Sequence, residues 1–144
     1  MLLGIIGAIG SQMLDGGFSA YFASRDAEEA DWQGHIALER MARDILRLRS
    51  SAPADLIITS TSQLTLTEYD GTAVSYGLSG NSLMRNGTPL ADGVSGLTFG
   101  YLQSDGATAA TQSTDVYYIA VNFTVTRNAV SRSWSTMLHP RNLR

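Results

Sequence analysis

Hydrophobic and polar residues follow two different patterns along the chain, and the change between them comes near residue 50. Proline is absent from residues 11–49, and beyond Gly17 the only glycine in that stretch is Gly34. Apolar residues recur near its end at steps of three and four residues, at Leu38, Met41, Ile45 and Leu48. This spacing predicts a helix whose apolar face packs on the rest of the protein. Pro53 ends the pattern, because its ring disfavours helical geometry at the preceding residue, so we expect the helix to stop near Ser50.

After residue 50 the pattern changes to the two-residue alternation of strands. Asp70-Gly71 separates two alternating segments, and this dipeptide favours a tight hairpin because both residues tolerate positive φ. Asn86-Gly87 and Asn128-Ala129 mark further turns. The expected strands fall within residues 56–58, 63–69, 72–78, 82–85, 97–101, 116–127 and 131–138. The expected strand within residues 116–127 has an inward row of Tyr117, Ile119, Val121, Phe123 and Val125.

One helix followed only by strands predicts an α+β fold, in which a long N-terminal α-helix packs on an antiparallel β-sheet domain. We divide the chain into a helix over residues 1–50 and a β-domain over residues 51–144. Within the helix, residues 1–24 are mostly apolar, whereas residues 25–50 are charged on one side and apolar on the other. The second half is therefore expected to cover the sheet.

The first fourteen residues carry no charge but are too few to span a bilayer as a helix. No basic region precedes them and no small-residue cleavage site follows, so they do not match a secretory signal peptide. Two interpretations stay open. The stretch is either a shortened membrane helix, or a buried core helix or signal remnant.

Composition excludes several classes of function. The formal charge of -3 gives the chain no electrostatic attraction for phosphates, so nucleic acid is not an expected partner. Cysteine is absent, which removes disulfides, thiolate metal sites and thiol catalysis. The two histidines, His35 and His139, are far apart in the sequence, and neither a GxSxG nor an HExxH motif is present. We therefore expect no enzyme, no cofactor, no metal and no small-molecule substrate.

An acidic group lies in the middle of the helix and comprises Asp26, Glu28, Glu29 and Asp31. It lacks the loop spacing of a calcium site, and a solvated helix face is the simpler interpretation. Alternatively, staggered neighbouring helices could pair it with Arg40, Arg43 and Arg47 of another subunit, about three turns away.

Four aromatic residues could in principle form a sugar platform, namely Trp32, Tyr117, Phe123 and Trp134. Aromatic residues at alternating strand positions more often belong to the core. The loop rich in Ser, Thr, Ala and Gly at residues 104–114 is the other candidate for ligand contact.

A resemblance to a known family rests on an apolar stretch that feeds a long helix ending in ALERMARDI at residues 37–45, and on three later runs. These runs are Val74-Ser75-Tyr76 to Leu83-Met84-Arg85-Asn86-Gly87, Leu90-Ala91-Asp92-Gly93-Val94 and Leu97-Thr98-Phe99-Gly100-Tyr101. The chain resembles type IV pilin-like proteins. It is similar to J-type pseudopilins of type II secretion and to PilW-like minor pilins, with minor pilins of mannose-sensitive haemagglutinin pili as a further possibility.

The resemblance implies a structural subunit of a type IV pilus or type II secretion filament, which acts in assembly initiation or at the tip. Its partners would be other pilin or pseudopilin subunits. Before assembly its helix would lie in the bacterial inner membrane, with the β-domain facing the periplasm. The implied assembly-helix interface comprises Leu2, Leu3, Ile5, Ile6, Ile9, Met13, Leu14 and Phe18, and the helix-sheet packing face comprises Leu38, Met41, Ile45 and Leu48.

One departure from the family concerns the N-terminal prepilin motif. A short basic leader, a Gly-Phe cleavage site and a glutamate at the fifth mature position are not found before Leu2-Leu3-Gly4. We expect either a truncated start or a divergent member. The alternative function is an adhesin-like binding module, which would recognise a carbohydrate or surface ligand through its β-domain.

Overall fold

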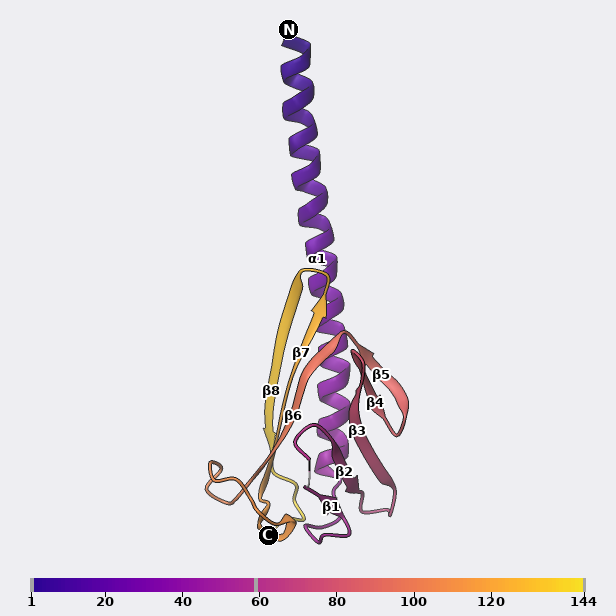
Figure 1. The fold of residues 1–144 in the computed structure, drawn as a ribbon, viewed down its shortest axis with the longest axis vertical. Coiled ribbons are helices and arrows are strands. Elements are labelled where there is room, and N and C mark those ends of the chain that lie inside the picture. Colours follow the sequence, from indigo (N-terminus) through magenta and orange to yellow (C-terminus); the bar gives the residue numbers. More distant parts are fainter. Residues whose placement is uncertain (1, 59, 144) are drawn as a thin grey trace.

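One long helix dominates the shape of the molecule. The computed structural model describes residues 2–58 and 60–143, and the side chains within the helix from Gln12 onward. Helix α1 (Leu2–Leu46) extends well beyond the strands at its N-terminal end and lies against them in its C-terminal half (Figure 1). The α+β fold predicted from the sequence is confirmed.

The strands of the antiparallel β-domain form two sheets. The first sheet has the order β1-β2-β3-β4-β5 and the second the order β6-β7-β8. The first sheet comprises β1 (Leu56–Ile57), β2 (Leu64–Thr67), β3 (Ala73–Ser79), β4 (Ser82–Arg85) and β5 (Thr88–Asp92). The second comprises β6 (Val94–Leu102), β7 (Tyr118–Arg127) and β8 (Val130–Leu138), with the short 3-10 helix η1 (Ser113–Asp115) between β6 and β7.

Tight turns join neighbouring strands, as their sequences predict. Gly71 has a φ of 88° in the turn between β2 and β3, where Leu64 pairs with Tyr76. Asn86 and Gly87 have φ values of 51° and 77° between β4 and β5. Positive φ at consecutive positions is what an Asn-Gly hairpin turn requires. These turns fix the register that points alternate apolar residues of each strand to the core.

Gly93 separates the two sheets. It is the single residue between β5 and β6, and its φ is 75°. A Cβ atom at this position would lie 2.5 Å from the carbonyl oxygen of Thr126, so only glycine fits the turn. The chain therefore leaves the first sheet here and enters the second. The sequence shows a glycine at this point but not which sheet the next strand joins.

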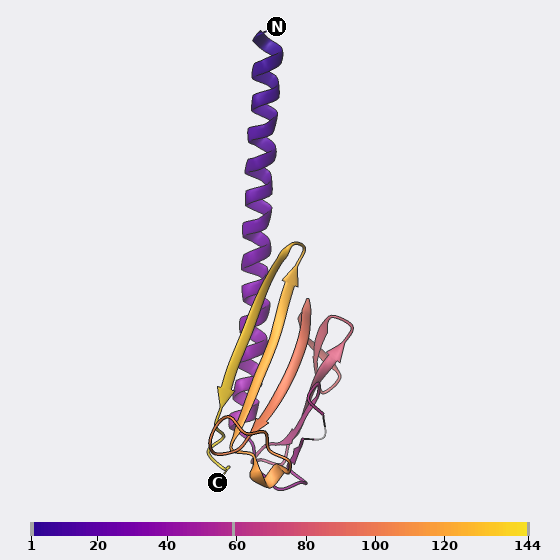
Figure 2. The same cartoon turned by 60° about the vertical axis from the view of Figure 1, so that its left-hand side comes forward.

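Helix α1 contacts both sheets, through β7 and β8 of one and β5 of the other. Figure 2 shows β7 and β8 running alongside its C-terminal half. The core between helix and sheets includes Met41, Ile45, Tyr76 and Phe99, all buried.

Several boundaries differ from the prediction. The helix ends at Leu46 rather than near Ser50, and Leu48 instead forms an isolated bridge to Glu68. The strand predicted to start at residue 116 begins at Tyr118, so Tyr117 lies outside the inward row assigned to it. Each difference comes from a hydrogen bond to a distant segment, such as Tyr117 N to Leu102 O at 2.7 Å, which local patterns cannot reveal.

Candidate assembly interface

Large apolar side chains are exposed along the part of α1 that projects beyond the strands. Met13, Leu14, Phe18, Tyr21 and Phe22 keep between 57% and 76% of their surface accessible. The steps from Leu14 to Phe18 and from Phe18 to Tyr21 are four and three residues, so these side chains share one helix face. We name residues 12–25 the projecting segment. A contiguous apolar surface of this kind is typical of sites that bind other proteins or membranes.

Two small residues shape this surface. Gly16 and Gly17 have no atoms of other elements near the position that a Cβ would occupy. Gly17 contributes to a shallow groove on the helix surface, together with Met13, Leu14, Phe18 and Tyr21. The ring of Phe22 meets that of Tyr21 edge to face at 5.8 Å. Small residues between large apolar ones allow another helix to approach closely.

The sequence prediction places eight residues in this interface. Met13, Leu14 and Phe18 lie exposed on the projecting segment. The side chains of the other five lie outside the described residues, namely Leu2, Leu3, Ile5, Ile6 and Ile9. Tyr21 and Phe22 were missed, although they continue the same helix face.

The acidic group at the base of the projecting segment contacts the tip of the β7–β8 hairpin of the same chain. Asn128 donates from Nδ2 to both carboxylate oxygens of Asp26 at 3.0 Å. Ion pairs join Arg127 to Glu29 at 3.5 Å and Arg132 to Asp31 at 3.3 Å. These contacts fix where the helix leaves the sheet.

The arginines that we considered as partners of this acidic group in a neighbouring subunit also have partners within the chain. Arg40 lies 3.6 Å from Asp44, and Arg43 lies 3.1 Å from Glu39. Arg47 contacts Glu68 and Asp70. Most of the charged groups considered for pairing between subunits therefore already have partners within the chain.

The face of α1 that docks on the sheets has large apolar residues near its C-terminal end and small residues further back. Met41, Ile45 and Leu48 are buried, and Leu38 is partly buried against the same core. Towards the N-terminus this face continues through Ala30, Gly34 and Ala37, each buried. A Cβ on Gly34 would lie 2.0 Å from Nε1 of Trp134, so the indole ring rests directly on the helix backbone. Residues 30, 34, 37 and 41 keep the helical steps of four and three, a signal that a search for large residues overlooks.

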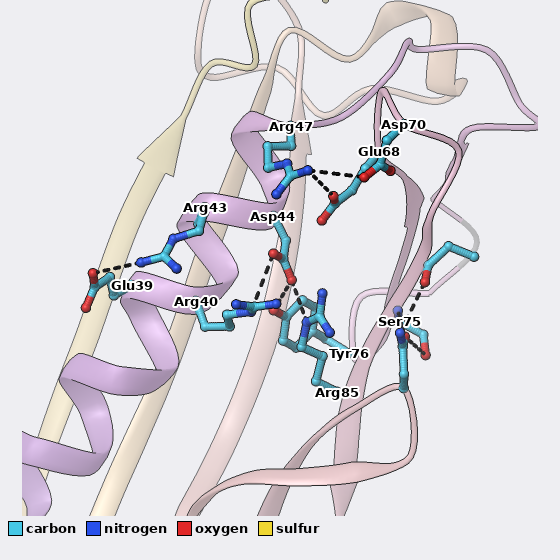
Figure 3. A network of polar contacts seen from close by, with 12 residues as sticks. Glu39, Arg40, Arg43, Asp44, Arg47, Glu68, Asp70, Ser75, Tyr76 and Arg85 are labelled. Carbon is cyan, nitrogen blue, oxygen red and sulfur yellow. Dashed lines mark hydrogen bonds and ion pairs between the residues drawn. The ribbon is translucent and has the colours of Figure 1, made fainter.

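A buried polar network ties the end of α1 to the first sheet (Figure 3). Asp44, only 1% exposed, accepts hydrogen bonds at Oδ2 from the Tyr76 hydroxyl and from Arg85 Nε, both at 2.6 Å. A buried carboxylate requires such donors, because removal from water is otherwise costly. The network thus fixes the helix end to β3 and β4.

Glu68 adds a second buried carboxyl to this network. Burial raises its pKa above the ordinary value, the cation of Arg47 opposes that shift, and the nearby Asp44 and Asp70 add to it. Arg47 Nη2 lies 3.1 Å from Glu68 Oε2 and 3.2 Å from Asp70 Oδ2. Burial and the Asp44 hydrogen bond also raise the pKa of Tyr76. No local pattern predicts this network, since its members are spread over more than forty positions of the chain.

An aromatic stack lies at the end of the β-domain far from the projecting segment. The rings of Tyr117 and His139 stack with centroids 4.7 Å apart. His139 Nδ1 lies 2.7 Å from the Tyr117 carbonyl oxygen, so this nitrogen is the donor. In the adjoining loop, hydrogen bonds from Thr108 and Ala107 lower the pKa of Asp105 to about 2.

The four aromatic residues considered for a sugar platform do not share one surface. Trp134 stacks with Phe123, with ring centroids 6.4 Å apart, and packs against the core. Trp32 is exposed on the helix, and Tyr117 belongs to the stack with His139. His35 lies 3.7 Å from Glu39 on the surface of α1. The other histidine, His139, follows β8, so the two do not belong to one element.

Among the described residues, no cluster of three or more His, Asp or Glu side chains is arranged to hold a metal ion. Within the same residues, no helix combines the length and the apolar character needed to cross a membrane.

No protein-family model and no curated protein matches this chain.

Proposed function

We propose that the chain is a structural subunit that assembles through α1, in the manner of the minor pilins and pseudopilins that its sequence resembles. The observation that carries this proposal is the exposed apolar surface of the projecting segment. Covering Phe18, Tyr21 and Phe22 would remove water from large rings, at a gain of about 1.5–3 kcal/mol for each ring that becomes fully buried.

The difference between the docked part of α1 and the projecting segment supports the proposal. From Ala30 onward the helix is held by the core and by the Asp44 network, so the β-domain can present the projecting segment in a fixed direction. The hairpin contacts to Asp26, Glu29 and Asp31 brace its base. In this proposal the partners are other pilin or pseudopilin subunits of a type IV pilus or type II secretion filament, with a role in initiation or at the tip.

The proposal also includes a stage before assembly, in which the N-terminal part of the helix lies in the bacterial inner membrane and the β-domain faces the periplasm. It assigns no catalytic residue, cofactor or small-molecule substrate to the chain.

The test is incorporation into surface filaments. An epitope-tagged full chain is expressed in its source cells, filaments are sheared off, and the tag is measured in the filament fraction. We expect the wild-type chain in that fraction and at least a tenfold loss for Phe18→Asp, because a charge would be buried at the contact. Leu46→Asp is the control, since Leu46 is exposed but lies outside the projecting segment. Equal incorporation of wild type and Phe18→Asp would contradict the proposal.

A second candidate function is favoured by the Tyr117 and His139 stack beside residues 104–114. Stacked, partly exposed aromatic rings suit the apolar face of a sugar, so we infer an adhesin-like role as the alternative. Glycan-array binding that disappears in Tyr117→Ala, but persists in Phe18→Asp, would favour it over assembly through the helix.

A further inference from the structure

The two sheets have four outer edges, and three of them are protected against pairing with another strand. Strand β5 contains Pro89, which lacks an N–H, and β1 has only two residues. The outer edge of β6 meets the loop between β1 and β2, since Phe99 N donates to Thr61 O at 2.7 Å. Short strands, proline and covering loops are the usual means by which proteins protect sheet edges.

Strand β8 is the exception. It has nine residues, pairs with β7 along one side, and has no strand beside its other side in the described part of the chain. Figure 1 shows it as the outermost strand of its sheet. The helix packs on the face of this sheet, over β8 and β7, where Gly34 approaches the indole of Trp134.

The hairpin geometry determines which backbone groups of β8 face outward. Arg127 pairs with Val130 across a two-residue turn, and such a closing pair exchanges hydrogen bonds. Thr126 N donates to Gly93 O, away from β8, so the next pair, Thr126 with Ser131, is not hydrogen-bonded. Alternation then directs the N–H and C=O groups of four residues to the open edge, at Ser131, Ser133, Ser135 and Met137.

The side chains along this edge carry no protecting charge. Ser131, Ser133 and Ser135 contact Thr126, Thr124 and Asn122 of β7 through their hydroxyl groups. The one charged residue of β8, Arg132, is paired with Asp31 of the helix. A long, neutral edge strand is a template for another strand.

We propose that the β8 edge pairs with β8 of a second copy of this chain, antiparallel and across a two-fold axis. In the register that uses all nine residues, the axis passes Trp134, the middle residue of the strand. Ser133 then lies opposite Ser135 of the second copy, and Arg132 opposite its Thr136. No like charges meet, and the four residues with outward backbone groups pair with one another.

The central position of Trp134 favours a second copy over an unrelated strand. The backbone N–H and C=O of Trp134 bond to β7, so the two Trp134 residues that meet at the axis form a non-hydrogen-bonded pair. In such a pair the side chains lie closest. Cross-strand aromatic pairs are among the most favourable in sheets. The result is a continuous sheet of six strands, three from each copy. This inference does not rest on the proposed function, because it involves no residue of the projecting segment.

The test measures the dissociation constant of the full chain in one mild detergent by sedimentation over a range of concentrations. Ser133→Pro removes an outward N–H but no backbone bond to β7. Ser133→Ala keeps that N–H and loses the same hydroxyl contact to Thr124, so it is the matched control. We expect dimers for wild type and Ser133→Ala, and a dissociation constant at least about tenfold higher for Ser133→Pro.

A second pair of variants tests the register and does not require proline to be tolerated. The double change Ser133→Glu with Ser135→Glu places like charges opposite each other and should weaken the dimer by about tenfold or more. The double change Ser133→Glu with Ser135→Arg places opposite charges there and should restore it. Both lose the same hydroxyl contacts to β7.

A wild-type chain that stays monomeric up to about 0.5 mM would overturn the inference. So would a dimer that responds equally to both double changes, whether or not Ser133→Pro folds. A Phe18→Asp variant should retain the β8 dimer. Loss of dimers in Phe18→Asp alone would attribute association to the helix and would overturn the β8 interface while leaving the proposed function in place.

Discussion

The two halves of α1 belong to one continuous helix but are built for different environments. The docked half, from Ala30 onward, buries small and medium side chains and pairs its charges within the chain. The projecting segment exposes Phe18, Tyr21 and Phe22 and contains the pair Gly16-Gly17. Helices in proteins owe most of their stability to packing of an apolar face. The docked half has that packing within the chain, whereas the projecting segment would obtain it from a partner.

This comparison predicts that the Asp44 network is the strongest single attachment of the docked half. Asp44→Ala leaves the Tyr76 hydroxyl and Arg85 without their acceptor, and should lower the free energy of unfolding of the full chain by about 3 kcal/mol. Urea unfolding measures this. The matched change is Glu39→Ala, which breaks the exposed pair with Arg43 and should cost no more than about 0.5 kcal/mol. Similar losses for both variants would show that burial of Asp44 adds nothing.

The next largest effect on the free energy of unfolding is expected at Gly34 of the docked half, in contrast to Gly16 of the projecting segment. Gly34→Ala places a methyl group where Trp134 lies, and should reduce the free energy of unfolding by about 2 kcal/mol. Gly16→Ala meets no neighbour and should leave the β-domain unchanged while raising helix content slightly. Urea unfolding and circular dichroism distinguish the two. If Gly34→Ala is as stable as wild type, the close approach of Trp134 to the helix is wrong.

A smaller effect follows from the raised pKa of Glu68. A folded-state pKa above the unfolded value of about 4.5 means that Glu68 contributes most to stability below that pH, and that the contribution is lost as pH rises through the folded pKa. Glu68→Gln cannot ionise. The stability of this variant relative to wild type should therefore increase from about pH 4 to about pH 7. A difference that is constant over this range would indicate that Glu68 has an ordinary pKa.

The smallest expected effect on stability concerns the projecting segment. Phe18→Ser should leave the free energy of unfolding of the dispersed chain within about 0.5 kcal/mol of wild type, because Phe18 contacts no core residue. Ile45→Ser, at a buried position of the same helix, should unfold the chain far more readily. A large loss in Phe18→Ser would mean that the segment folds back on the β-domain in solution.

The sequence was sufficient for the elements whose signals are local. The helical steps from Leu38 to Leu48 predicted the docked face, the Asp70-Gly71 turn predicted the β2–β3 hairpin, and the α+β class followed from their order. The turn at Asn86-Gly87 was also predicted, but the strand β5 that follows it was not. Met13, Leu14 and Phe18 were selected for the candidate interface because they are apolar residues at the start of a long helix.

What depends on contacts between distant residues could not be predicted. The division into two sheets rests on the approach of Gly93 to Thr126, and the position of Gly34 on its contact with Trp134. The Asp44 network joins α1 to β3, to β4 and to the turn between β2 and β3, and no spacing rule relates these segments. Tyr21 and Phe22 were overlooked because their exposure depends on where the sheets end along the helix.

Burial of the projecting segment on assembly is measured most directly by the reactivity of a single cysteine at position 18. The chain has no cysteine of its own, so Phe18→Cys and, as a control in the exposed distal loop, Ala107→Cys each give one labelling site. In the dispersed chain both should react with a thiol probe. In sheared filaments we expect position 18 to become at least tenfold less reactive while position 107 is unchanged. Equal labelling of position 18 in the two states would contradict assembly through the projecting segment.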